Sequence, residues 1–383
     1  MSDDDVLILD DDDRYARLRL ISWWRQEKLL ASKVLVVGAG ALGNEVLKNL
    51  ALLGVGHIFV IDMDTIDKSN LTRSVLFRAE DRGRRKVDVA AVRTRELNPD
   101  VRVTPIHGDV MLDLGLGLFR DIDVTIGCLD NREARLFVNR ASWRVSKPWV
   151  DGAIQEISGV AKVFVPPTSA CYECAMTEAD YKLINLRYSC PLLKREDLLA
   201  GKVPTAPTIS SFIAGLQTQE ALKLLHGMEV QAGSAFIFNG VANTFYTTKF
   251  PFRDDCLSHE TYDPVEPFPL STNDTVATLL EKVGGTALEL DRDFLVGLTC
   301  PKCGDRRAID RPLATVAQAD AFCPKCREMC ATESIHRVDK SSALAARPLR
   351  DLAVPPYDIV RVQTATGRRF ILLANDRSHY FPT

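Results

Sequence analysis

The sequence predicts an α/β fold with a twisted, largely parallel sheet, and three observations support this. A continuous apolar run at 34–37 fits a buried parallel strand. A glycine-rich turn follows the run and leads into an apolar helix over 42–53. A second apolar strand at 58–61 ends at Asp62, about 20 residues beyond the turn, as in a nucleotide-binding βαβ unit. The glycines of the turn are Gly38, Gly40 and Gly43.

This unit alone does not separate NAD from ATP, because both contain adenosine with a free ribose diol. Polar residues further along the chain favour ATP. Two cations suit a triphosphate and two carboxylates suit magnesium, whereas a hydride-transfer site has little use for either. These polar residues are Asp64, Asn70, Arg73, Lys86 and Asp130. An NAD oxidoreductase is a formal alternative that leaves them unexplained.

The polar residues belong to an ordered set of motifs. The first runs from Asp62 to Arg73, the second is Gly83-Arg-Arg-Lys86, and the third is Cys128-Leu-Asp130-Asn131-x-x-x-Arg135. Together they closely resemble the adenylation domain of ubiquitin-like-protein activating enzymes and of bacterial sulfur-carrier adenylyltransferases, the ThiF/MoeB superfamily. The resemblance extends from about residue 14 to residue 259. Ser74 departs from it, because the family usually has glutamine there.

The resemblance implies a defined reaction, in which ATP and magnesium are used to adenylate the C-terminal carboxylate of a small β-grasp protein. It also implies roles for individual residues. Gly38, Gly40 and Gly43 would border the phosphates, and Asp62 would hold the ribose. The remaining nucleotide contacts would be phosphate contacts from Asn70, Arg73 and Lys86, a magnesium ligand at Asp130, and further contacts from Asp64 and Asn131.

The N-terminal motif Arg14-Tyr-Ala-Arg17 also resembles the family. The resemblance implies that Arg17 reaches across a homodimer interface into the partner's ATP site. The alternative is a single amphipathic helix over 15–30, whose arginines form its solvent-exposed face. Residues 1–13 are expected to be a disordered acidic lead that at most stabilises the start of a helix.

Length and composition agree with a multidomain globular protein. The 383 residues exceed one typical core, so two or three domains are expected, and 46% of the residues are hydrophobic. The net charge of −3 gives no electrostatic reason to expect nucleic acid or membrane binding. No signal-peptide pattern is apparent, so we expect the protein to be cytoplasmic.

Most of the ten cysteines have the spacing of metal ligands. Three Cys-x-x-Cys pairs and one Cys-x-x-His pair provide eight ligands, enough for two tetrahedral structural zinc sites. Spacing alone predicts a zinc ribbon from Cys300, Cys303, Cys323 and Cys326, but it leaves several pairings possible. The family resemblance implies that the other site comprises Cys171, Cys174, Cys256 and His259. A thioredoxin-type dithiol is the alternative.

Cys190 differs from the zinc-ligand cysteines, because it lies in a polar connecting segment within 175–208. The segment is similar to the crossover segment of activating enzymes, which carries the cysteine that accepts the acyl group. Arg187 and Lys194 could lower the pKa of this thiol. The alternative is an incidental free cysteine, and Cys128 on its apolar strand is interpreted as a packed small residue.

The chain changes character after the adenylation domain, residues 14–262. Residues 263–270 are proline-rich and are expected to be a hinge, and a capped amphipathic helix begins near 271. Alternating strands around Ala365-Thr-Gly-Arg predict a hairpin. The region 271–383 resembles the ubiquitin-like α+β domain that docks a conjugating enzyme, here with the zinc ribbon inserted near 298–330. No rhodanese-like domain is recognisable, which favours the conjugating branch of the family.

The sequence therefore predicts an enzyme that adenylates a ubiquitin-like protein, takes it onto Cys190 as a thioester and passes it to a conjugating enzyme. One alternative is a sulfur-carrier adenylyltransferase whose reaction stops at the acyl-adenylate. Another is a zinc-stabilised interaction protein with a degenerate nucleotide site.

Overall fold

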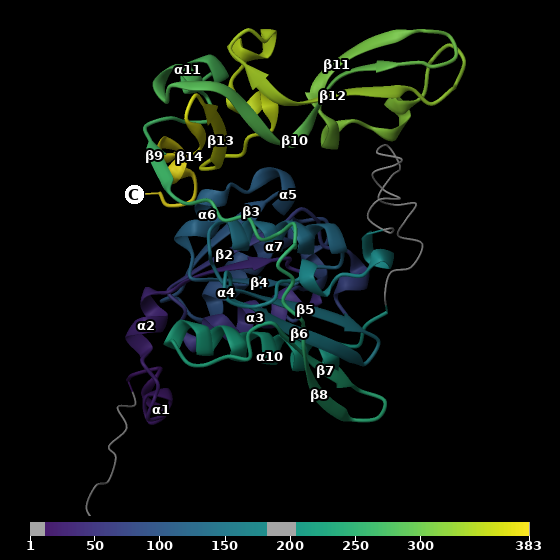
Figure 1. Ribbon diagram of the computed structural model, residues 1–383. Coiled ribbons are helices and arrows are strands. Elements are labelled where there is room, and N and C mark those ends of the chain that lie inside the picture. The colour runs from purple at the N-terminus through teal and green to yellow at the C-terminus, as the bar shows by residue number, and fades with distance from the viewer. Residues whose placement is uncertain (1–11, 182–203, 383) are drawn as a thin grey trace, which may run out of the picture.

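The computed structural model describes residues 12–181 and 204–382, and an eight-stranded sheet organises the N-terminal domain. The strand order is β3-β2-β1-β4-β5-β6-β7-β8 (Figure 1). The first five strands in this order are parallel and the last three are antiparallel, which confirms the largely parallel sheet. In chain order they are β1 Lys33–Val37, β2 His57–Asp62, β3 Arg102–His107, β4 Val124–Gly127, β5 Trp149–Gln155, β6 Ser158–Phe164, β7 Ser234–Asn239 and β8 Thr244–Lys249.

Helices cover both faces of this sheet. Because side chains alternate along a strand, Val34 and Val36 of β1 face one core, whereas Leu35 and Val37 face the other. The first core contains α3 Ala41–Leu53, α4 Lys86–Leu97 and α10 Pro207–His226. The second lies beneath α5 Val110–Asp113, α6 Leu116–Asp121 and α7 Arg132–Arg144. Figure 1 shows these last three helices on the side that meets the C-terminal domain.

The N-terminal segment does not form one helix over 15–30. It forms α1 Ala16–Arg19 and α2 Gln26–Ala31, with residues 20–25 between them. Tyr15 anchors the segment, because its buried hydroxyl accepts a hydrogen bond of 2.7 Å from Asn98. Residues 1–11 of the expected acidic lead lie outside the described residues.

The C-terminal domain is built on a mixed sheet in the order β11-β10-β13-β14-β9, with β12 also paired to β10. A helix, α11 Val276–Lys282, begins at a Thr275 cap and packs into the domain's own core. The predicted hairpin is confirmed as β13–β14. The bounds are β9 Val265–Phe268, β10 Gly285–Thr299, β11 Arg306–Pro312, β12 Ala331–Asp339, β13 Ile359–Thr364 and β14 Gly367–Leu373.

Residues 263–270 are not simply a hinge, because they include β9, which pairs in parallel with β14. The prolines that suggested a linker are tolerated because β9 is an edge strand, and the backbone groups on its outer edge need no partner in the sheet. The ubiquitin-like assignment of the domain stays a prediction.

The two domains meet at a close backbone contact. The amide of Gly117 in α6 donates a hydrogen bond of 2.9 Å to the carbonyl of Tyr357. A Cβ atom on Gly117 would lie 2.3 Å from that same oxygen, so only glycine fits there. Beside it, the Leu116 amide donates to the buried carboxylate of Asp358 at 2.8 Å. Tyr380 is also fully buried, and its hydroxyl donates to the Asp113 carbonyl. The C-terminal domain is therefore tightly docked.

Two groups of metal-ligating side chains come together in the described part of the chain. Each group places its four ligand atoms within 4.8 Å of one another. The Cys171 and Cys256 sulfurs lie 3.6 Å apart, close to the roughly 3.8 Å expected between sulfurs of a tetrahedral zinc site. The pairings match those predicted, namely Cys171, Cys174, Cys256 and His259 in one group, and Cys300, Cys303, Cys323 and Cys326 in the other. Zinc suits both donor sets.

We expect Gly117→Ala to destabilise the protein by about 1–3 kcal/mol, because the new methyl group overlaps the Tyr357 carbonyl. Gly215→Ala in α10 is the matched control. A Cβ there meets nothing within 4 Å, so the better helix propensity of alanine should stabilise by up to about 1 kcal/mol. Urea unfolding measures both changes, and equal effects of the two substitutions would contradict the close contact.

Asp358 gives a pH-dependent prediction. Burial raises the pKa of its carboxyl from 3.8 to about 6, and Asp291 adds to the rise. Because burial disfavours the charged form, the folded protein loses stability as the pH rises from about 4 to about 6 and the carboxyl ionises. The stability of Asp358→Asn relative to the wild type should therefore be higher at pH 8 than at pH 4, by about 2–3 kcal/mol for a shift of this size. Urea midpoints at the two pH values test this, and a pH-independent difference would refute it.

Zinc analysis of the purified chain should give two ions per molecule, one for each ligand group. Cys303→Ser should lose one ion while leaving the N-terminal domain's unfolding temperature unchanged, because Cys303 is exposed in the ribbon. Cys174→Ser should lose the other and lower that temperature, since Cys174 is buried beside α7. Retention of both ions in either variant would contradict the assigned ligands.

Candidate functional site

The glycine-rich turn lies between β1 and α3, with its backbone packed against the end of β4. A Cβ atom on Gly38 would lie 2.4 Å from the Cys128 carbonyl oxygen, and one on Gly43 would lie 1.9 Å from the Gly38 carbonyl oxygen. A Cβ on Gly40 would meet nothing within 4 Å. Gly38 and Gly43 are therefore needed for packing, whereas Gly40 leaves open space at the start of α3. That helix N-terminus is suited to an anion such as phosphate.

Asp62 holds the turn in place from the end of β2. One of its carboxylate oxygens accepts a hydrogen bond of 2.7 Å from the Ala39 amide, and the other accepts one of 2.8 Å from the Asp64 amide. Burial raises the pKa of Asp62, while Lys86 nearby acts in the opposite direction. The structure thus gives Asp62 a role in shaping the turn. The ribose contact implied by the family resemblance stays a prediction.

Lys86 is the first residue of α4, and its ammonium group lies 2.8 Å from the Asp64 carboxylate. Its side chain is only 10% exposed, whereas that of Asp64 is 60% exposed. A buried amine with one exposed carboxylate partner is a fixed cation that can also face an incoming phosphate. The structure therefore pairs Asp64 with Lys86.

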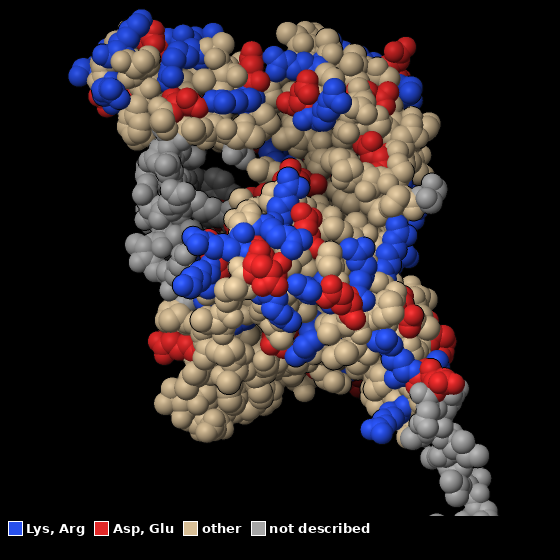
Figure 2. All heavy atoms as spheres, turned by 180° about the vertical axis from the view of Figure 1, so that it is seen from behind, with Lys and Arg blue, Asp and Glu red and all other residues tan. Residues whose placement is uncertain are grey.

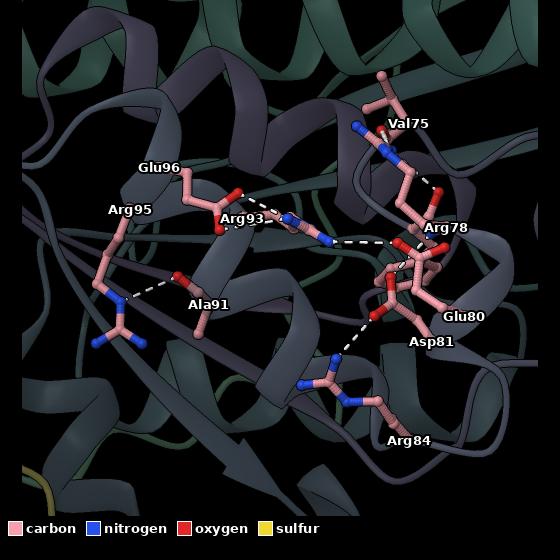
Figure 3. A network of polar contacts seen from close by, with 10 residues as sticks. Val75, Arg78, Glu80, Asp81, Arg84, Ala91, Arg93, Arg95 and Glu96 are labelled. Atoms are coloured by element: carbon pink, nitrogen blue, oxygen red, sulfur yellow. Dashed lines mark hydrogen bonds and ion pairs between the residues drawn. The ribbon is translucent and has the colours of Figure 1, made fainter.

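Ion pairs stabilise the loop that leads to Lys86 (Figure 3). The fully buried Asp81 carboxylate accepts hydrogen bonds from the Arg84 guanidinium at 2.8 Å and from the Arg78 amide at 2.9 Å. Arg93 on α4 reaches Glu96 at 3.0 Å and Glu80 at 3.9 Å. Arg84 is thus engaged in holding the loop, and Lys86 is the cation that the loop positions.

Asn70 and Arg73 occupy the turn that follows β2. The Asn70 side-chain oxygen accepts from the Asp67 amide at 2.9 Å, which closes the turn η1, Lys68–Asn70. The Arg73 guanidinium donates to the Ser69 carbonyl at 3.0 Å and is partly exposed. Ser74, where the family usually has glutamine, is buried and offers no long polar side chain here. Arg73 has further donors available for phosphate.

Asp130 is exposed just beyond the end of β4, and Asn131 links it to α7. The Asn131 side chain caps α7 by accepting from the Ala134 amide at 2.8 Å and donates to the Asp130 carboxylate at 3.3 Å. In the described residues, Asp130 does not belong to a group of three or more metal ligands. A single carboxylate fits magnesium that is held mainly by nucleotide phosphates and water.

The structure does not show either Arg17 or Cys190 at this edge of the sheet. Arg17 is exposed, and its side chain makes no hydrogen bond or ion pair within the described residues. Its neighbour Arg14 contacts the Leu97 carbonyl at the last residue of α4, about 17 Å along that helix from Lys86. Cys190 lies outside the described residues.

Three polar residues near the end of β4, each largely buried, were not predicted as site residues. They are Asp151 on β5, Lys162 on β6 and Gln217 on α10. The only sequence signal was a charged or amide residue within an otherwise apolar element, and such residues are usually exposed. The structure is needed to show that they lie beside the end of β4, where the loop that carries Asp130 begins.

On the face shown in Figure 2, Lys and Arg alternate with Asp and Glu over the N-terminal domain. Within the described residues, none of the helices has both the length and the apolar composition needed to span a bilayer.

Comparison with known proteins gives one family match and several similar relatives. The family model described as "ThiF family" matches residues 13–258, more than half of the chain. The SAMP-activating enzyme E1 of Haloferax volcanii is 32% identical over 60% of this chain and 81% of its own length. The sulfur carrier protein adenylyltransferase of Thermus thermophilus is 34% identical over 57% of this chain and 79% of its own.

Eukaryotic relatives match over a shorter region. The NEDD8-activating enzyme E1 catalytic subunit of Schizosaccharomyces pombe is 38% identical over 38% of this chain, which spans only 34% of that protein. Among solved structures, Escherichia coli MccB with ATP has a TM-score of 0.55 over 65% of this chain and 74% of its own. At 23% identity, this match supports the fold alone. The predicted resemblance is confirmed, and the chain belongs to the ThiF family, with relatives that include both modifier-activating enzymes and sulfur-carrier adenylyltransferases.

Proposed function

We propose that this protein uses ATP and magnesium to adenylate the C-terminal carboxylate of a ubiquitin-like protein, takes the acyl group onto Cys190, and passes it to a conjugating enzyme. The observation that carries the proposal is the grouping of three features at one edge of the sheet. There, the open turn at Gly40, the fixed ammonium of Lys86 and the capped Asp130 loop come together in a ThiF-family fold. A zinc-stabilised interaction protein with a degenerate nucleotide site would not need these features.

The adenylation step needs charge stabilisation more than covalent chemistry. A carboxylate oxygen of the ubiquitin-like protein attacks the α-phosphorus of ATP, the α–β bridging P–O bond breaks, and pyrophosphate leaves. Negative charge then builds on the phosphate oxygens, and preorganised cations stabilise it. Lys86 and Arg73 would meet that charge, while the N-terminus of α3 would bind phosphate. Magnesium, held at Asp130, would neutralise phosphate charge.

Thioester formation would follow on Cys190. Its thiolate attacks the acyl carbon of the adenylate, and AMP leaves with the bonding electrons. The described chain ends just before this segment at Tyr181, whose hydroxyl donates to Glu173 at 2.9 Å, and resumes at Pro204. Both ends of the segment therefore connect to ordered parts of the adenylation domain. The C-terminal domain would dock the conjugating enzyme.

The position of Arg17 supports action as a homodimer. Arg17 is exposed on α1, and its side chain makes no hydrogen bond or ion pair within the described residues; the nearby Arg14 contacts the last residue of α4. In a homodimer, this exposed arginine would serve the nucleotide site of the second copy. Cytoplasmic residence is part of the proposal, because eight zinc-ligating side chains are mostly cysteine thiolates that require a reducing compartment.

One observation favours a second candidate function. The sulfur carrier protein adenylyltransferase of Thermus thermophilus aligns over 79% of its length, whereas the NEDD8-activating subunit of Schizosaccharomyces pombe aligns over only 34%. The second candidate function is that of a sulfur-carrier adenylyltransferase. The adenylate would then be the final product of this protein, ready for attack by a sulfur donor. The fate of the acyl group distinguishes the two functions.

Electrophoresis distinguishes them directly. The chain is incubated with ATP, magnesium and a purified ubiquitin-like protein from the same genome, with or without a reducing agent. We expect a band that is lost on reduction, absent in Cys190→Ala, and present in Cys330→Ala, the matched control. A form of the ubiquitin-like protein with an amidated C-terminus should give no band.

If ATP–pyrophosphate exchange proceeds but no reducible band forms, the reaction stops at the adenylate and the thioester proposal is wrong. A reducible band that survives in Cys190→Ala would also show that Cys190 is not the acceptor.

A further inference from the structure

A largely buried group of three charged side chains lies directly beneath the Asp130 loop. The Asp151 carboxylate is fully buried. It accepts a hydrogen bond of 2.9 Å from the Arg135 guanidinium and one of 3.0 Å from the Lys162 ammonium. Asp151 and Lys162 are directly opposite each other on β5 and β6. A buried carboxylate is costly unless it is paired, and here two cations pair with it.

Arg135 connects this group to the backbone of the loop. Its guanidinium also donates to the carbonyls of Leu129 and of Gly152, the latter at 3.1 Å. Leu129 immediately precedes Asp130. One planar guanidinium therefore joins the buried carboxylate to the peptide unit from which the Asp130 side chain emerges. Lysine cannot reproduce this arrangement, because its single ammonium lacks the flat array of donors.

The preceding peptide units are fixed as well. The Gly127 carbonyl accepts a hydrogen bond of 2.8 Å from the fully buried Gln217 side chain. The Cys128 amide donates to the Val37 carbonyl at 2.8 Å. Every residue from Gly127 to Leu129 thus has a backbone group held by a neighbour. Asp130 itself is exposed, and its direction depends on these contacts.

We propose that Arg135 and Asp151 are positioning residues for the Asp130 loop, in which Arg135 holds the Leu129 carbonyl and Asp151 holds Arg135. The Asp130 carboxylate would then be held in one orientation and would need no rearrangement to hold magnesium that arrives with ATP. This inference rests on the proposed function, because it assigns the metal to Asp130. Lys162 neutralises charge on Asp151 and, among the described residues, makes no hydrogen bond to the loop.

The test uses the full chain and measures Mn²⁺ binding in the presence of α,β-methylene-ATP, from the electron paramagnetic resonance signal of free Mn²⁺. Arg135→Lys should weaken Mn²⁺ binding by about 10–100-fold, the usual effect of removing a residue that orients a metal ligand. Nucleotide binding without metal should change far less, because Arg135 makes none of the contacts that hold the glycine turn.

Lys162→Met is the matched control, since it removes the other cation from the same carboxylate and should leave Mn²⁺ affinity close to that of the wild type. Asp151→Asn should act in the same direction as Arg135→Lys. The variant that combines Arg135→Lys and Asp151→Asn should bind Mn²⁺ no less tightly than whichever single variant has the lower affinity, because the two residues act as one unit. Thermal unfolding identifies variants that do not fold, and Arg135→Lys retains the charge pair if Asp151→Asn fails.

Wild-type Mn²⁺ affinity in Arg135→Lys would overturn the inference and leave the proposed function intact, as would an equal loss in Lys162→Met. A wild-type chain that binds no Mn²⁺ with the nucleotide would overturn both the inference and the magnesium part of the proposed function.

Discussion

Helix α7 is the element on which the rest of the structure depends. This one helix, about 20 Å long, touches the Asp130 loop, the metal group that includes His259, and the C-terminal domain. Near its start, Asn131 caps the helix and orients Asp130. At its middle and end, three further contacts follow, namely Arg140 with Glu173 at 2.8 Å, Trp143 stacked on His259 at 3.8 Å, and Arg144 with Asp291 at 3.2 Å. Displacing α7 would disturb all three regions together.

The nucleotide edge illustrates how a site can be rigid before any ligand arrives. Asp62 holds the glycine turn, Asp81 holds the loop before Lys86, and Asp151 holds Arg135 beneath Asp130. In each case a carboxylate, fully buried at Asp81 and Asp151 and partly buried at Asp62, fixes a neighbouring backbone or side chain. Fixed cations and dipoles stabilise developing charge without reorganisation, which is the main contribution a protein can make to phosphoryl or nucleotidyl transfer. The same rigidity suits an ATP-using member of the ThiF family.

Much of the architecture was predictable, because local patterns determine it. The run at 34–37 is continuously apolar, the glycine-rich turn leads into the apolar helix predicted over 42–53, and the Cys-x-x-Cys spacings limited the metal groups. Strand β9 was missed because its prolines indicate a linker, and only long-range pairing with β14 makes it a strand. Asp151 was missed for a similar reason: its partner Lys162 is 11 residues away and its partner Arg135 is 16 residues away, across strand pairings that the sequence does not display. The docking of the two domains through Gly117 is likewise a property of packing alone.

The edge of the sheet at Gly40, Lys86 and Asp130 is, in our proposal, a catalytic ATP site. The most direct test is the exchange of labelled pyrophosphate into ATP, measured with and without the ubiquitin-like protein. The wild-type chain should catalyse exchange only when that protein is present with a free C-terminal carboxylate. Lys86→Met should abolish exchange while leaving the fold intact, because it removes the fixed ammonium from the site. Exchange that needs no ubiquitin-like protein, or that persists in Lys86→Met at the wild-type rate, would contradict the proposed catalytic site.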